Sequence, residues 1–241
     1  MLTVMNEQLL LVQKYLQERR ASGECPKTGQ PFITIAREAG TGAHLLARLL
    51  TVQFMQEADR DLFRGWHVFD REICEVVAND PTLHASLEDL LSEHHPSQIQ
   101  GFVEDILTGS SHQYRLDKKT FEIVRMLATI GKSIIVGRAG NFVTQGMPKG
   151  LRIRLVAPLR DRIRRTMSSF NVGRERAQEM IDEQDREGAR LVRQYFSADV
   201  ADAAHYDVVW NTATNDPEDI AAAVVDLVRR RAARPPAPRH G

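Results

Sequence analysis

The sequence is poor in the residues that mark a secreted, metal-binding or membrane protein. Its two cysteines, Cys25 and Cys74, are too few and too far apart for a disulfide framework or a metal site. It contains no CxxC or HExxH pattern. The first residues lack a basic patch followed by an apolar run, and no window reaches the length of a membrane span. We therefore expect a cytoplasmic protein with no membrane partner and no metal site.

Net charge is absent as well, because 32 Lys plus Arg balance 32 Asp plus Glu. Aromatic residues make up 6% of the chain, which leaves few rings on which nucleic-acid bases could stack. We expect no nucleic-acid partner. The 42% of apolar residues is enough for a full core, and 241 residues fit one α/β domain with an extension.

Positive charge is unevenly distributed along the chain. Residues 151–193 contain eleven arginines, no lysine and seven acids. Arginine without lysine suits planar, bidentate recognition of phosphate. A solvated helix face carrying Arg–Glu pairs is the alternative interpretation.

Alternating strand and helix patterns begin at residue 32 and predict a parallel sheet with crossover helices. We expect strands at residues 32–35, 67–69, 133–136, 151–156 and 208–210. Helices are expected at about 43–57, from 71 to 78, from a cap at Thr120 to Ile130, after Pro158, from about 174 to 195, and from Asp216 onward.

Both ends of the chain differ from this alternating pattern. Apolar residues at positions 5, 9, 12 and 16 share one helical face, so residues 1–31 are expected to form an N-terminal helix on a tether. That helix would pack on the domain or on a partner. Residues 229–241 are basic and contain proline, and we expect a disordered tail.

Residues 80–116 are polar and rich in histidine, with helical fragments expected at 87–91 and 99–107. A pair such as His94 and His95 suggests metal binding, but adjacent histidines on a helix point apart. We expect these two, and the histidines at 84 and 112, to be surface residues.

The stretch from residue 33 to 44 places a strand, a Gly40-Thr41-Gly42 turn and the start of a helix in succession. Backbone N–H groups converge in such a turn, and the helix dipole adds partial positive charge, which together make an anion site. A plain tight turn is the alternative. A standard P-loop has Lys and then Ser or Thr after its last glycine, whereas this chain has Ala43 and His44, which argues against kinase activity.

Five segments match the motifs of one family in the order in which that family has them. Residues 36–43 match Ser-Arg-Glu-x-Gly-Ser-Gly-Gly, residues 69–73 match an apolar residue followed by Asp-Lys-Glu-Ile, and residues 134–139 match a strand that ends in Val-Gly-Arg. Residues 155–165 match a strand followed by an Arg-rich helix, and residues 206–212 match the last strand. In these motifs the chain resembles the cytidylate kinase-like family, a relative of bacterial cytidylate kinase.

The resemblance covers about residues 32–228 and implies a fold and an activity. The implied fold is that of a P-loop NTPase: an α/β protein with a doubly wound parallel sheet of about five strands, helices on both faces, a helical acceptor-site insert and an Arg-rich lid at about 167–196. The implied activity is transfer of the ATP γ-phosphoryl group to a nucleoside monophosphate, with ATP and magnesium as cofactors and nucleotides as the partners. A nucleotide-binding regulatory or scaffold module that has lost catalysis is the alternative. The oligomeric state is left open.

The resemblance also implies roles for individual residues. Arg37, Glu38, Gly40, Thr41, Gly42, Ala43 and His44 would bind the donor, Asp70 and Arg138 the acceptor, and Arg162, Arg165, Asp185, Arg190 and Arg193 would act in catalysis.

Three of these roles have structural alternatives. Arg138 could be a structural residue that pairs with a buried acid, and Asp70 could cap the helix that begins at Arg71. Glu38 is the nearest candidate to organise magnesium, but it could equally form a salt bridge with Arg37 or a lid arginine. Arg165 ends the helix face that starts with Arg162, so we expect it to reach inward to the transferring phosphoryl group.

The chain departs from the family pattern at two further places. The family has Asp-x-x-Arg in its lid, and three residues after Asp185 this chain has Gly188. Bacterial cytidylate kinase has Asp-Gly-Arg-Asp where this chain has Val136 and Ala139 in place of the two acids. Both departures weaken the expectation of catalysis more than the expectation of fold.

Overall fold

The structure, a computed structural model, describes residues 2–21, 30–94 and 112–233. Its centre is one parallel sheet of five strands in the order β2-β3-β1-β4-β5. The expected α/β class, strand number and parallel direction are confirmed, and the strand order is consistent with a P-loop NTPase. The strands are β1 (Phe32–Arg37), β2 (His67–Phe69), β3 (Ser133–Val136), β4 (Gly150–Val156) and β5 (Val208–Asn211).

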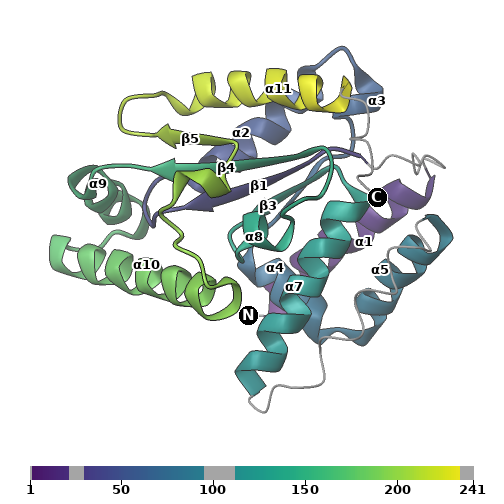
Figure 1. Cartoon of the computed structure of the whole chain (residues 1–241), viewed down its shortest axis with the longest axis horizontal. Helices are drawn as coiled ribbons and strands as arrows, with labels where there is room; N and C mark the ends of the chain where they lie inside the picture. The colour runs from purple at the N-terminus through teal and green to yellow at the C-terminus, as the bar shows by residue number, and fades with distance from the viewer. Residues whose placement is uncertain (1, 22–29, 95–111, 234–241) are drawn as a thin grey trace.

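Helices connect the strands and pack on both faces of the sheet (Figure 1). They are α1 (Leu2–Ala21), α2 (Ala43–Gln56), α3 (Arg60–Phe63), α4 (Arg71–Asn79), α5 (Pro81–His94), α7 (His112–Ile130), α8 (Gly140–Val143), α9 (Leu159–Phe170), α10 (Arg174–Phe196) and α11 (Pro217–Ala233), with a short 3-10 helix, η1 (Ala203–His205). None of the described helices is both long and apolar enough to cross a membrane.

Each face of the sheet has its own hydrophobic core. Ile33 and Ile35 of β1 point to the face covered by α2, α3 and α11, whereas Phe32 points to the face covered by α1, α4, α5 and α7. This alternation follows from the period of two in a strand, and burial on both faces explains the nearly continuous apolar strands.

Helices α9 and α10 form a hairpin at the edge of the sheet where the strands end (Figure 1). Ile163 of α9 packs with Ala177 and Ile181 of α10 and with Ala39, which follows β1. The other end of α10 is held by aromatic contacts, because the ring of Phe196 packs on Phe142 of α8 and on α7. The hairpin contains the segment expected to be the lid.

The structure corrects two expectations about helix bounds. Thr120 does not cap a helix: it lies inside α7, where its hydroxyl donates to the carbonyl of Leu116 at 2.8 Å. Residues 229–233 belong to α11 instead of to a disordered tail, and Arg229 pairs with Glu57 at 2.7 Å. The expected N-terminal helix is α1, which spans twenty residues and packs on the domain, against α4 and α5.

Two further expectations concern residues that the structure does not describe. The helical fragment expected at residues 99–107 and the tail segment 234–241 both lie outside the described ranges.

Candidate active site

The ends of three neighbouring strands carry the polar residues of the candidate site. Because β3 lies between β1 and β2, the turns that follow these strands are adjacent at one edge of the sheet. Arg37 ends β1, Asp70 and Arg71 follow β2, and Gly137 and Arg138 follow β3. Ligands of open parallel sheets bind at such carboxyl ends, where the strand order switches direction.

Three guanidinium groups converge at this edge. Burial lowers the pKa of the Arg37 side chain, and the charges of Arg138 and Arg71 lower it further. Burial also lowers the pKa of Arg138, again with Arg71 as a contributor. Burial would lower the pKa of Arg71 as well, but its hydrogen bonds to Glu187 and Glu75 outweigh burial and raise it. Arg37 and Arg138 are thus the two cations that an added anion would stabilise.

Glycine at position 137 allows Arg37 to reach this position. Gly137 has a φ of 84°, and a Cβ built on it would lie 2.1 Å from Nη1 of Arg37. Any side chain at residue 137 would therefore displace the guanidinium. The Val-Gly-Arg motif thus supplies both a cation and the space for a second one.

Two glutamates neutralise part of this charge. Oε1 of Glu75 accepts from Nε of Arg71 at 3.0 Å and from Nη1 of Arg138 at 3.2 Å. Oε2 of Glu187, on α10, accepts from Nη1 of Arg71 at 2.9 Å, and Oε1 lies 2.8 Å from the same nitrogen in the ion pair. Within the described residues, the side chain of Arg37 makes no hydrogen bond or ion pair. Arg138 is thus paired with an acid, but Glu75 is half-buried and not the buried acid that the alternative supposed.

The glycine turn between β1 and α2 has the backbone shape expected of an anion-binding loop. Gly40 and Gly42 have φ values of 79° and 89°, in the region that favours glycine. A Cβ at Gly40 would lie 2.8 Å from a backbone oxygen of α9, so this glycine also allows close packing. Thr41 is buried and its hydroxyl donates to the carbonyl of Glu38 at 2.7 Å, while His44 is exposed on α2. The first residue of α2, Ala43, is buried and adds no charge.

Asp185 and Arg162 attach the lid to this turn. Asp185 accepts the backbone N–H of Ala39 at 2.7 Å through Oδ1, and Nη1 of Arg162 at 2.6 Å through Oδ2. Arg162 donates further to the carbonyls of Ala39 and Ala157. Oε2 of Glu38 lies 3.5 Å from Nε of Arg162. Glu38 therefore forms a salt bridge with a lid arginine, which is one of the structural alternatives to a role in magnesium binding. These contacts hold α9, α10 and the turn together.

Within the described residues, Arg165 makes no hydrogen bond or ion pair with the glycine turn, and its role in catalysis remains a prediction. Arg165 donates to the hydroxyl of Thr212 at 2.9 Å and to its carbonyl, beyond the end of β5. Arg162 contacts the glycine turn in its place. Arg190 and Arg193 are exposed on α10 and make no ion pair within the described residues. Their contact with donor phosphates remains a prediction.

Asp70 caps α4. Its Oδ1 accepts the backbone N–H of Ile73 at 3.0 Å, as the alternative interpretation expected. The neighbouring Cys74 is fully buried, and burial raises the pKa of its thiol to about 12. A thiol with so high a pKa is not a nucleophile near neutral pH.

Three residues of the site were missed from sequence: Arg71, Glu75 and Glu187. Arg71 could have been found from the sequence, because it follows Asp70 in a strand-end motif and stands where the family motif has lysine. Glu187 could not have been found in this way, because its partner Arg71 is 116 residues away in the chain.

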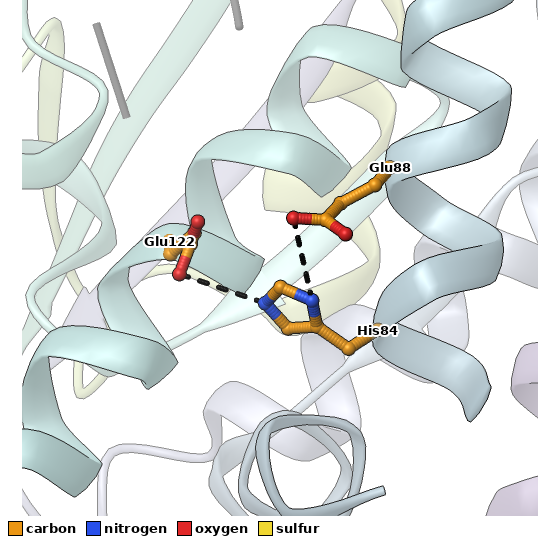
Figure 2. Close-up of side chains that lie close together, drawn as sticks. All are labelled: His84, Glu88 and Glu122. Carbon is orange, nitrogen blue, oxygen red and sulfur yellow. Dashed lines mark ion pairs between the residues drawn. The ribbon is translucent and has the colours of Figure 1, made fainter. Parts of the chain in front are cut away.

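A second polar cluster lies between α5 and α7, away from this edge (Figure 2). The His84 ring lies between two carboxylates, with Nδ1 3.6 Å from Glu88 and Nε2 3.5 Å from Glu122. One metal ion would use a single ring nitrogen, so two carboxylates on opposite nitrogens fit a protonated imidazole better. The hydrogen bond to Glu122 raises the pKa of His84, with Lys119 as the opposing cation. His84 therefore forms ion pairs with two glutamates and is not assigned to a metal site. The side chains of the histidines at 94, 95 and 112 are not among those that the structure describes.

Two solved structures and one curated protein resemble this chain, and the first of the structures shares its fold. An uncharacterised protein from Eubacterium ventriosum superposes with a TM-score of 0.61 at 19% identity, over 84% of this chain and all of that one. The protein TT1252 from Thermus thermophilus gives a TM-score of 0.41 at 15% identity, over 84% of this chain and 98% of that one. A cytidylate kinase from Sulfolobus acidocaldarius is 26% identical over 119 residues, which are 49% of this chain and 65% of that relative.

The family match is more extensive than the match to that relative. Residues 32–214 match the cytidylate kinase-like family, and this range contains the glycine turn, the arginine cluster and the α9–α10 hairpin. The chain belongs to the cytidylate kinase-like family.

Proposed function

We propose that this protein transfers the γ-phosphoryl group of ATP to a nucleoside monophosphate of the cytidylate type, or to a related small acceptor. The observation that supports it best is the convergence of Arg37, Arg71 and Arg138 at the strand ends, on the same edge of the sheet as the glycine turn. An acceptor phosphate on the arginines and a donor on the turn would lie next to each other at one edge of the sheet. Positioning and charge neutralisation are what phosphoryl transfer mainly requires.

In the proposed reaction, a phosphate oxygen of the acceptor attacks the γ-phosphorus, and the bond from that phosphorus to the β–γ bridging oxygen breaks. The acceptor becomes a nucleoside diphosphate and ADP leaves. Arg37, Arg71 and Arg138 would hold the acceptor phosphate through planar, bidentate contacts. Arg162 and Asp185 would position the turn, and the exposed Arg190 and Arg193 would meet the donor phosphates as α10 closes.

Magnesium would enter with ATP, whose phosphates supply most of its ligands, so the protein needs to offer only one or two carboxylates. Glu38 fits this limited role. Its Oε2 accepts the N–H of Ala157 at 3.1 Å, and Oε1 makes no hydrogen bond within the described residues. When bound, the ion would neutralise charge on the phosphates.

A specific observation favours a second candidate, a nucleotide-binding module without turnover. Asp185 occupies the N–H of Ala39, and Arg162 and Arg165 are both engaged with protein groups. With Ala43 at the lysine position, few cations remain to meet the charge that develops during transfer.

Phosphorus NMR decides between the two functions. Purified protein with ATP and magnesium is offered a panel of nucleoside monophosphates, and we expect new diphosphate signals with at least one of them. Arg138→Lys keeps the charge but loses bidentate geometry, and should reduce transfer strongly. Arg176→Lys, which alters an exposed Arg–Glu pair on α10, is the matched control and should not. Tight ATP binding with no transfer to any acceptor would establish the module instead.

A further inference from the structure

We propose that Glu187 determines specificity at the acceptor site, because its carboxylate occupies the position that the acceptor phosphate would take. This inference rests on the proposed function of the arginine cluster. Acceptor binding then requires that the phosphate displace Glu187, and a ligand without a strongly charged phosphate cannot do so.

The position of the carboxylate supports this. Glu187 reaches from α10 to Nη1 of Arg71 with both oxygens, at 2.8 and 2.9 Å, and lies 3.8 Å from Nη2 of Arg138. A planar carboxylate between two guanidiniums is what one face of a bound phosphate would present to them. Glu75, by contrast, belongs to α4 and lies on the same helix as Arg71, so it forms part of the site's wall.

Charge makes the exchange favourable for a phosphate. Glu187 brings one negative charge and two oxygens, and within the described residues it leaves Arg37 without a partner. A phosphate monoester carries about −1.5 to −2 charges at pH 7 and offers three oxygens. It can therefore satisfy Arg71, Arg138 and Arg37 together, which the carboxylate does not.

Glu187 is also able to leave. Its side chain is 39% exposed, so the displaced carboxylate can turn to solvent. Asp185, two residues earlier, binds the glycine turn and not the arginine cluster. Displacement would thus detach α10 from Arg71 while its attachment to the turn remains, so arrival of the acceptor changes how the lid is held.

Glu187→Gln removes the charge with little change in shape, and Glu187→Asp keeps the charge on a shorter side chain. Glu183→Gln is the matched control: Glu183 lies one turn earlier on α10, is exposed and makes no ion pair within the described residues. Calorimetry with inorganic phosphate tests the site without assuming a base, and cytidine tests a ligand without phosphate. Hydrogen exchange of ligand-free protein reports how firmly α10 is held.

We expect Glu187→Gln to bind phosphate about two- to five-fold more tightly than wild type, because the phosphate no longer has to break an ion pair before it binds. Glu183→Gln should match wild type, Glu187→Asp should lie between, and cytidine should bind no better to any variant. Exchange in α10 should be faster in Glu187→Gln alone.

Equal phosphate affinity in all four proteins, or weaker binding by Glu187→Gln, would refute the role of Glu187 and leave the arginine site standing. Absence of phosphate binding in every protein would instead refute the acceptor site and the proposed function with it.

Discussion

Replacement of Gly137 by alanine would test whether Arg37 belongs to the anion site. The new Cβ would lie 2.1 Å from Nη1 and 2.9 Å from Cζ of Arg37, distances at which the guanidinium has to move. Alanine would also have to adopt a φ of 84°. The substitution therefore has two separable effects, one on the backbone and one on the site.

The backbone effect concerns stability. An alanine in the left-handed region costs about 1 to 2 kcal/mol, which for a chain of this length corresponds to a drop in Tm of roughly 2 to 8 °C. The site effect concerns affinity. Loss of one hydrogen bond to a charged group costs about 1.5 to 3 kcal/mol, which is roughly ten- to 150-fold in Kd for phosphate.

A matched control separates the two effects. Gly146 has nearly the same φ, 78°, but a Cβ there would meet nothing within 4 Å. Gly146→Ala should lower the Tm by a similar amount and leave phosphate binding unchanged, as read by differential scanning fluorimetry and calorimetry. If Gly137→Ala binds phosphate as well as Gly146→Ala does, Arg37 has no place in the site and our assignment is wrong.

Three further predictions use other contacts. Gly188→Ala should raise the free energy of unfolding by about 0.5 to 1 kcal/mol in a denaturant melt, because a Cβ there meets nothing and alanine is the better helix former; no gain would mean that the glycine serves a purpose we have missed. His84 has a folded pKa raised by Glu122, so the stability it contributes is present below its unfolded pKa of about 6.5 and is lost as pH rises through the folded value. The difference in stability between wild type and His84→Gln should accordingly shrink from pH 5.5 to 8.5, and a constant difference would contradict the ion pair. In the NMR assay, Arg162→Ala should reduce transfer at least as much as Arg165→Ala, and the reverse order would support the prediction made from sequence.

Most of the fold could be predicted from the sequence because its signals are local. The strands at residues 67–69 and 133–136 were predicted to the residue, since short apolar runs there are bounded by glycine or polar residues. Thr120 misled because one hydroxyl can either cap a helix or bond to the preceding turn, and the sequence does not say which.

The candidate site could be predicted only in part. The glycine turn at residues 40–42 could be predicted, because glycine in such a pattern indicates a backbone conformation with positive φ. Side-chain directions on helices do not. Arg162 and Arg165 lie three residues apart on one helix, and what separates their roles is Asp185 on another helix and Thr212 beyond the last strand. Such partners are fixed only when the chain has folded.

Helices α1 and α11 have a consequence for where the folding unit ends. The family match runs from residue 32 to 214, and both helices lie outside it. Yet Tyr15 of α1 is fully buried on one face of the sheet and donates its hydroxyl to the carbonyl of Gly131, and Val224 of α11 is fully buried on the other face. A chain cut to the matched range would expose an apolar surface on each side of its sheet, so evolutionary boundary and physical boundary do not coincide in this protein.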